Sequence, residues 1–172
     1  LGRLEKSKGV DTLLDAVAGL KDRVLIAGKG SELESLRARA TANVEFLGAV
    51  EEDQLRALYR GASMAVFPSH FEGFGLVALE ALSSGTPVAV TNGFGFRLIP
   101  PASHWVEWFA PGDVAGCAAA IEKLRGRKTA AWSQAAHEMV ARHHNQRDRV
   151  LGLVILYESP VAGRGVPPSP PH

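Results

Sequence analysis

The chain has 172 residues, of which 46% are hydrophobic and 22% charged, and its formal net charge is +1 at pH 7. A chain of this length can bury the core of one domain of ordinary size, and its nearly balanced charge gives no reason to expect a nucleic acid as partner. The single cysteine, Cys117, excludes a disulfide framework and a cysteine-based metal site, and no apolar run approaches the roughly 20 residues of a transmembrane helix.

The predicted elements alternate between short apolar strands and amphipathic helices. Residues 1–4 are expected to be the end of a strand whose beginning is missing, so that the chain is a fragment of a longer protein. Apolar runs predict further strands over residues 24–27, 44–47, 64–67, 87–91 and 105–109. Helical spacing predicts helices over residues 10–20, from residue 31 onward, and over 51–59, 76–82 and 113–124, with two or three more within 128–158. The Pro- and Gly-rich residues 159–172 are expected to be a disordered tail, which leaves one domain over residues 1–158.

Three local signals predict where helices begin and end. Ser31 and Glu34 form a capping-box pattern at the start of one helix, and Asp113 is the predicted N-cap of another. Gly85 is the expected C-terminal glycine of the helix that begins near residue 75.

Strands that alternate with helices over short loops predict an α/β fold, a Rossmann-like parallel sheet with helices on both faces. Ligands of such sheets bind at the carboxyl ends of the strands, where the strand order reverses. The functional loops are therefore expected to follow Leu4, Ala27, Leu47, Phe67 and Thr91.

The loop after Phe67 carries the most informative pattern, with Glu72 before two glycines and Glu80 in the helix that follows. Gly73 and Gly75 would let a ligand approach the backbone closely, and a helix start offers N–H groups and a positive dipole end to a phosphate. One carboxylate can accept hydrogen bonds from both hydroxyls of a vicinal diol. Two carboxylates around a phosphate site therefore predict a sugar–diphosphate–ribose ligand, a nucleotide sugar.

Positive charge for a diphosphate is available in the amino-terminal loop LGRLEKSKG, which contains Arg3, Lys6 and Lys8. Arginine binds phosphate oxygens bidentately, and lysine acts as a point charge. By contrast, Gly28-Lys29-Gly30 begins a dinucleotide fingerprint that Leu33 interrupts at the position of the third glycine. A simple turn is the better interpretation of that segment taken alone.

The chain resembles the carboxy-terminal, donor-binding half of GT-B glycosyltransferases, of the retaining family 4 type. The resemblance covers roughly residues 1–125. Its most specific part runs from Pro68 through Glu72-Gly73-Phe74-Gly75-Leu76 to Glu80, in which seven residues separate the two glutamates. The other matching segments are residues 2–11, 26–30, 43–48, 85–88 and 110–113.

This resemblance implies a full enzyme of two Rossmann-like domains that transfers a sugar from a nucleotide-diphosphate sugar with retention of configuration. An amino-terminal domain would hold the acceptor, and no metal or other cofactor is implied, because basic residues neutralise the diphosphate. By position, Arg3 and Lys8 would stabilise the leaving diphosphate, and Glu72 would bind hydroxyls of the reacting sugar. The implied donor-binding residues are Glu80 at the ribose, Gly73, Phe74, Gly75 and Leu76 at the phosphates, and Gly28 and Gly30 on the nucleotide side. We expect a cytoplasmic protein, with peripheral association at the inner face of a membrane left open.

One segment departs from the family pattern. After Thr91 the family usually has a Gly-Gly loop followed closely by an acid, whereas residues 92–101 contain no acid, and the next one is Glu107. The sugar is therefore left open, and a degenerate, non-catalytic GT-B module that binds a nucleotide or a partner protein is the main alternative. A dinucleotide oxidoreductase would need a full glycine fingerprint and a ribose-binding acid. A flavodoxin-like domain with coincidental motifs is the remaining alternative.

Overall fold

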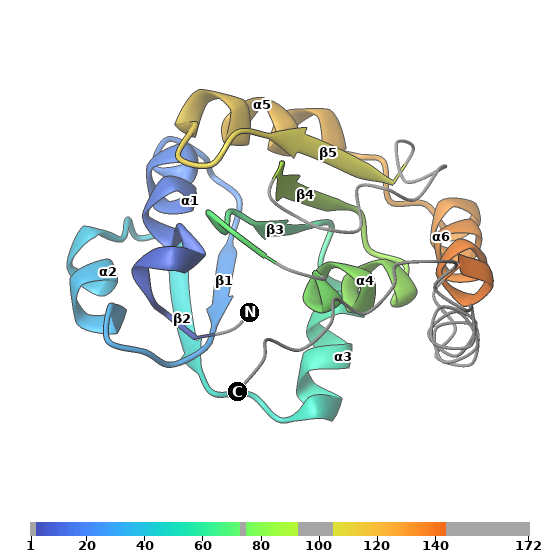
Figure 1. The fold of residues 1–172 in the computed structure, drawn as a ribbon, viewed down its shortest axis with the longest axis horizontal. Helices are drawn as coiled ribbons and strands as arrows, with labels where there is room; N and C mark the ends of the chain where they lie inside the picture. Colours follow the sequence, from blue (N-terminus) through green and yellow to red (C-terminus); the bar gives the residue numbers. More distant parts are fainter. Residues whose placement is uncertain (1–2, 73–74, 93–104, 144–172) are drawn as a thin grey trace, which may run out of the picture.

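The computed structural model describes residues 3–72, 75–92 and 105–143 (Figure 1). The expected domain end at residue 158 and the expected tail over 159–172 lie outside these residues. The elements in chain order are the short 3-10 helix η1 (Lys6–Lys8), α1 (Val10–Val17), β1 (Val24–Ala27), α2 (Leu33–Arg39), β2 (Val44–Gly48), α3 (Glu52–Gly61), β3 (Ala65–Phe67), α4 (Leu76–Ser83), β4 (Val88–Thr91), β5 (Val106–Phe109), α5 (Val114–Leu124) and α6 (Ala130–His143). The strands predicted within residues 24–109 are all confirmed, each to within one residue at either end.

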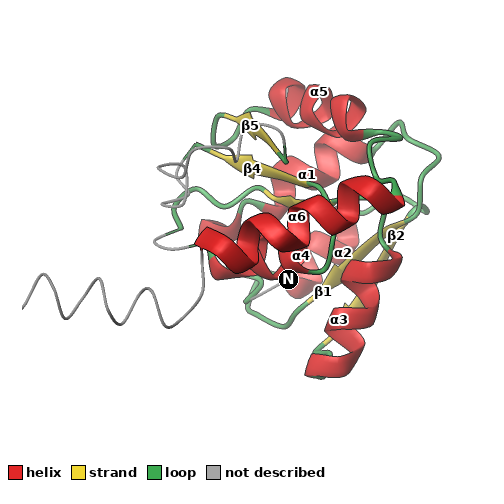
Figure 2. Ribbon diagram, turned by 90° about the vertical axis from the view of Figure 1, so that its right-hand side faces the viewer, coloured by secondary structure: helices red, strands yellow, loops and turns green. Residues whose placement is uncertain are grey.

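Helices cover both faces of the strands (Figures 1 and 2). α1, α2 and α5 lie on one face, and α3, α4 and α6 lie on the other. The side chains of β4 show this division, because Val88 and Val90 share a core cluster with Leu79 of α4, whereas Ala89 packs with Cys117 of α5. All four residues of β4 are buried, as expected for a strand covered on both faces.

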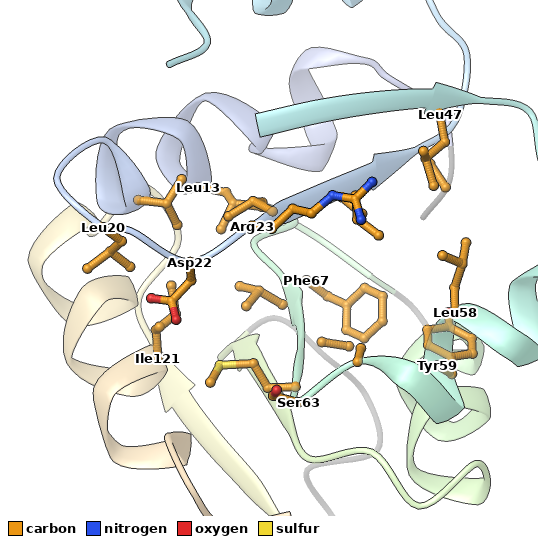
Figure 3. A pocket seen from close by; sticks show the side chains of 18 of the residues that line it. Leu13, Leu20, Asp22, Arg23, Leu47, Leu58, Tyr59, Ser63, Phe67 and Ile121 are labelled. Carbon is orange, nitrogen blue, oxygen red and sulfur yellow. The ribbon is translucent and has the colours of Figure 1, made fainter. Parts of the chain in front are cut away.

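Every strand pairing is parallel, so the predicted α/β fold class is confirmed. The strands do not form one continuous sheet, however. β1 pairs with β2, while β3, β4 and β5 form a second sheet in that order. Residues of β1 and β3, which belong to different sheets, line a common cavity (Figure 3).

The strand end expected at residues 1–4 falls partly on residues that the structure does not describe. Arg3 and Leu4 belong to no strand, and residues 1–2 lie outside the described part of the chain. The Leu4 N–H donates to the carbonyl oxygen of Lys29 at 2.8 Å, and the Leu4 carbonyl accepts the N–H of Glu32 at 3.0 Å. Backbone groups of Leu4 are thus engaged by the loop between β1 and α2.

The same contact explains why the predicted capping box at α2 is wrong. The N-cap position is Glu32, no side chain caps this helix, and α2 begins only at Leu33. The Leu4 carbonyl accepts the N–H of Glu32. A segment distant in the chain therefore supplies a hydrogen-bond acceptor at the start of α2, where the Ser31 side chain was expected to supply one.

Two other helix signals are confirmed. Asp113 caps α5, since its Oδ1 accepts the N–H of Gly116 at 2.8 Å. Gly85 follows α4 in the left-handed region, with a φ of 73°, and its N–H donates to the Leu82 carbonyl at 2.9 Å, as in a glycine-terminated helix. No helix among the described residues is long and apolar enough to cross a bilayer.

Lys128 holds the end of α3 against the start of β4. Its Nζ donates to the carbonyl oxygens of Tyr59, Arg60 and Ala62 at 3.2, 2.7 and 2.6 Å and to Thr86 Oγ1 at 3.1 Å. We expect Lys128→Met to lower the free energy of unfolding by about 1–3 kcal/mol, because the part-buried carbonyl groups of Tyr59 and Ala62 lose their donor while the apolar stem is kept. Urea unfolding measures this loss.

Lys21→Met is the matched control, because Lys21 is an exposed lysine in the loop before β1. This variant is expected to unfold like the parent chain, as surface substitutions usually do. Equal midpoints for Lys128→Met and Lys21→Met would contradict a structural role of the Lys128 ammonium group.

Candidate active site

The loop after β3 contacts both the amino-terminal segment and the end of β4. The N–H of His70, in the loop after β3, donates to the carbonyl oxygen of Ser7 in η1 at 2.9 Å. Thr91, at the end of β4, donates its hydroxyl to the carbonyl oxygen of Ser69. The predicted convergence of the amino-terminal loop with the loops after Phe67 and Thr91 is therefore present.

Lys8 and Glu72 meet in this cluster of loops. The Lys8 Nζ lies 2.7 Å from Glu72 Oε2 and donates a hydrogen bond to it. The two side chains are only 27% and 23% exposed, so the pair is more protected from solvent than the usual surface ion pair. A charge-assisted bond of this length fixes the ammonium group in space. Two candidate catalytic residues that are far apart in the sequence thus form one unit.

Gly9 allows this approach, and sequence reasoning missed it. Its φ is 60°, in the left-handed region, and a Cβ at this position would lie 2.2 Å from the carbonyl oxygen of Pro68. Only glycine therefore lets η1 lie against the loop after β3, with Lys8 beside Glu72. The Lys-Gly sequence before a helical pattern suggests a helix boundary, but no local pattern identifies Pro68 as the neighbour.

Arg3 lies near the pair without joining it. Its side chain is 80% exposed, and its guanidinium pairs with Glu5 Oε1 at 3.2 Å. Together with Lys8, Arg3 lines a small cavity of about 60 Å³ where β1 and β3 end, next to Ala27 and Ser69. The structure therefore brings Arg3 to the edge of the site, in an exposed ion pair that contributes little to stability.

The start of α4 faces the same loop. Gly75 occupies the N-cap position with a φ of 64°, and no side chain caps the helix. Leu76, the first residue of α4, is 51% exposed. The first N–H groups of a helix have no intrahelical partner and lie at its positive dipole end. The predicted phosphate-binding residues Gly73 and Phe74 lie outside the described part of the chain.

Gly28 and Gly30 both make close backbone contacts within the fold. The Gly28 N–H donates to the carbonyl oxygen of Gly48 at 2.7 Å, which continues the contact of β1 with β2. A Cβ at Gly30 would lie 2.2 Å from the carbonyl oxygen of Leu4. Glycine at position 30 is thus required by the close approach of the amino-terminal segment, whether or not a nucleotide binds there.

Glu80 borders a different cavity from Arg3 and Lys8. This cavity, of about 730 Å³, lies among α3, α4 and α6, and Glu52, Tyr59 and His137 also line it. Partial burial raises the pKa of the Glu80 carboxyl, and the negative charge of Glu52 raises it further. Burial, together with the charge of Glu80, also raises the pKa of the Tyr59 hydroxyl. Glu80 therefore lies on the side of α4 that faces α3.

Other reactive side chains of the described residues are placed differently. Cys117 is buried in α5, and burial raises the pKa of its thiol to about 12, so that it stays protonated at neutral pH. Within residues 3–72, 75–92 and 105–143, no three His, Cys, Asp or Glu side chains cluster in a way that could hold a metal ion.

Known proteins share this sequence pattern. The family model of the glycosyl transferases group 1 matches residues 1–126. The glycogen synthase of Mycobacterium tuberculosis is 37% identical over 147 residues, which cover 78% of this chain and 35% of that protein. The phosphatidyl-myo-inositol mannosyltransferase of Mycobacterium leprae is 35% identical over 151 residues, which cover 78% of this chain and 40% of that protein.

Solved structures share the fold. Sucrose-phosphate synthase from Thermosynechococcus elongatus superposes with a TM-score of 0.77 at 27% identity, over 91% of this chain and 43% of that one. An Anabaena protein solved with UDP and glucose superposes with a TM-score of 0.76 at 22% identity, over 92% of this chain and 47% of that one. The chain thus spans less than half the length of these relatives. Since the family model covers well over half of its residues, the chain belongs to the glycosyl transferases group 1.

Proposed function

We propose that this chain is the donor-binding domain of a retaining glycosyltransferase of the GT-B, family 4 type. It binds a nucleotide-diphosphate sugar, and an amino-terminal domain of the longer protein holds the acceptor. The observation that supports this most directly is the ion pair of Lys8 and Glu72, 2.7 Å apart, in the loop that leads to the uncapped start of α4. Independence from metal and a cytoplasmic location belong to the same proposal.

The ion pair has unused hydrogen-bonding capacity on both sides. A lysine ammonium group has three donors, and Glu72 takes one of them, so two remain for diphosphate oxygens. Glu72 uses Oε2 for Lys8, which leaves Oε1 to accept from a hydroxyl of the donor sugar. Because glycosyl transfer develops negative charge on the departing diphosphate and positive charge on the sugar, a cation and an anion held side by side suit both fragments.

The remaining contacts follow from the positions of the other residues. Backbone N–H groups at the start of α4, from Gly75 and Leu76, would bind phosphate oxygens. Arg3 can leave its exposed pair with Glu5 to reach the same phosphates, and Glu80 would accept hydrogen bonds from the ribose hydroxyls. Gly28 would line the nucleotide side. The Anabaena protein of the same fold was solved with UDP and glucose, which supports a nucleotide sugar as the ligand class.

Thermal unfolding with UDP, GDP, ADP or NAD, each with and without magnesium, tests the proposal. A ligand present at about 100 times its Kd stabilises a protein by roughly 2.7 kcal/mol, which corresponds to a shift of about 5–10 °C for a chain of this size. We expect one nucleoside diphosphate to produce this shift without magnesium. Stabilisation by NAD alone would instead support the oxidoreductase.

The degenerate module remains the second candidate, because residues 92–101 lack the acid that the family usually carries there. It predicts no donor-dependent turnover in the longer protein even when a nucleotide binds. Absence of any shift in a chain that circular dichroism shows to be folded would contradict the donor-binding function.

Glu80→Gln is expected to weaken binding of the nucleoside diphosphate about 10- to 100-fold, the usual value of a hydrogen bond to a charged group. The substitution should also change how the affinity for the nucleoside diphosphate depends on pH. Burial and Glu52 raise the pKa of Glu80 in the free protein, whereas hydroxyl donors would favour its charged form. The parent chain should therefore lose affinity as pH falls through this raised pKa.

Isothermal titration from pH 5 to pH 8 measures both effects. In the Glu80→Gln variant, the affinity should no longer change with pH through the titration of Glu80. The change in affinity that comes from titration of the ligand's phosphate should be the same in both proteins. Glu34→Gln, on the exposed side of α2, is the control and should bind like the parent. Unchanged affinity in Glu80→Gln would remove Glu80 from the binding site.

A further inference from the structure

The imidazole of His70 is a polar group near the ion pair that the proposed donor contacts leave unused. His70 lies in the loop after β3, two residues before Glu72, and its side chain is exposed. A loop histidine is ordinarily solvated, so exposure alone indicates no function. The argument for a function comes from the contacts that hold the backbone and the ring of His70 in place.

The backbone at His70 is held from two sides. The His70 N–H donates to the carbonyl oxygen of Ser7 in η1 at 2.9 Å. The preceding residue, Ser69, is buried, and its carbonyl oxygen accepts the hydroxyl of Thr91 at the end of β4. The loop is thus fixed between η1 and a core strand. A side chain carried by such a loop is positioned before a ligand binds, as a functional residue needs to be.

The ring of His70 lies against Gly9. A Cβ built on Gly9 would be 3.6 Å from His70 Nε2, which is an ordinary van der Waals distance. Gly9 directly follows Lys8, and consecutive Cα atoms are only about 3.8 Å apart. Lys8 in turn bonds Glu72 at 2.7 Å. The imidazole therefore lies in the immediate surroundings of the ion pair, on the side of η1.

The chemistry at this point suits an anion. The ammonium group of Lys8 is close by, and α1 begins at Gly9 without a side-chain cap, so its first N–H groups have no intrahelical partner. Either ring nitrogen of a neutral imidazole can carry the proton and donate it, and hydrogen bonds to a charged acceptor are the stronger ones. Glu72 already offers a free oxygen to a sugar hydroxyl. The N–H of His70 is therefore best matched by a phosphate oxygen.

We propose that His70 is a further donor-binding residue, whose imidazole N–H donates a hydrogen bond to a diphosphate oxygen of the nucleotide sugar, beside Lys8. This inference rests on the proposed function and adds one residue to that site. Since the contact is to the diphosphate itself, it is made with a nucleoside diphosphate that carries no sugar. The contribution of His70 is therefore measurable as binding affinity in this chain, without an acceptor and without turnover.

Two substitutions separate a hydrogen-bond donor from a packing residue. His70→Phe keeps a flat ring against Gly9 and removes the donor, whereas His70→Gln keeps an N–H donor and removes the ring. Isothermal titration with UDP, GDP and ADP first identifies the nucleoside diphosphate that the parent chain binds. His70→Phe should bind it about tenfold or more weakly, the usual loss of a hydrogen bond to a charged group, and His70→Gln should bind it nearly as well as the parent. The reverse order, or equal affinity in all three proteins, would overturn the proposal.

Three controls complete the test. Lys6→Ala, an exposed residue of η1, should bind like the parent, and His70→Phe should keep the parent's urea midpoint because the side chain is exposed. A lowered midpoint in His70→Phe would show a structural role, and an equal loss of affinity for the matching nucleoside would place the imidazole at the base or ribose. Either result overturns the phosphate contact while the proposed function stands. A parent chain that binds none of the three diphosphates contradicts the proposed function and this inference together.

Discussion

Replacing Lys8 with alanine in the longer enzyme that carries this chain is expected to lower kcat by about 10²- to 10³-fold, the usual loss when one preorganised donor to a developing negative charge is removed. Glu72 holds the Lys8 ammonium group 2.7 Å away in a largely buried position, so this donor is already oriented before the donor substrate binds. The KM for the nucleotide sugar should change little, because the contact strengthens mainly as the diphosphate departs. Initial-rate kinetics with a varied donor concentration separate the two parameters.

Lys6→Ala is the matched control. Lys6 lies in the same short helix η1 as Lys8, but it is exposed and does not line the small cavity. This variant should turn over at a rate close to that of the parent. Thermal unfolding of both variants separates a folding defect from a catalytic one, because Lys8→Ala leaves the half-buried Glu72 without its cation. Full turnover in Lys8→Ala would contradict the role of Lys8 in stabilising the leaving diphosphate. An equal loss of turnover in Lys6→Ala would show that the loss comes from removing any positive charge in η1.

Gly9→Ala is expected to lower the free energy of unfolding by about 2–4 kcal/mol, from a left-handed φ that costs alanine roughly 1–2 kcal/mol and from overpacking. The φ of Gly9 is 60°, and the added Cβ would lie 2.2 Å from the carbonyl oxygen of Pro68. The clashing atom is the backbone carbonyl oxygen of Pro68, which lies in a buried part of its loop and cannot rotate away as a side chain could. The clash between this oxygen and the added Cβ is therefore relieved only if η1 moves away. Chemical unfolding in urea measures the change.

Gly61→Ala is the control for this substitution. Gly61 is the last residue of α3, and a Cβ there would meet no atom within 4 Å. Alanine should leave stability unchanged or raise it by up to about 1 kcal/mol, since it is the better helix former. Equal stability of Gly9→Ala and the parent would show that η1 is not held against Pro68. If Gly9→Ala is destabilised, separation of Lys8 from Glu72 should also lower kcat in the longer enzyme.

Local patterns were sufficient for most of the fold. The strands at Val24–Ala27 and Val88–Thr91 are short apolar runs between turn residues, and the structure contains both at the predicted positions. Asp113 and Gly85 act as the predicted helix cap and helix end, because these signals involve residues only a few positions away. The rule that ligands bind at the carboxyl ends of parallel strands predicted the loop of Glu72, after β3, as a functional loop.

Predictions that depended on distant neighbours were wrong or incomplete. The start of α2 was expected to be capped by Ser31, but the Leu4 carbonyl accepts the N–H of Glu32. The parallel pairing of the strands was predicted correctly, but strand–helix alternation carries no information on whether β1 and β3 are adjacent, and the structure has them in two separate sheets. Glu80 was placed in the correct helix, but its position beside Glu52 of α3 depends on how two helices pack.

The sequence by itself determined the α/β class, because periodicity and turn residues are encoded locally, and its segment from Pro68 to Glu80 carried the resemblance to GT-B glycosyltransferases. Only the tertiary structure decided that Lys8 pairs with Glu72, that Gly9 must be glycine, and that β1 and β3 belong to separate sheets and line a common cavity. Each of these depends on the distance between atoms that are remote along the chain. Packing sets such distances, and no pattern of neighbouring residues specifies them.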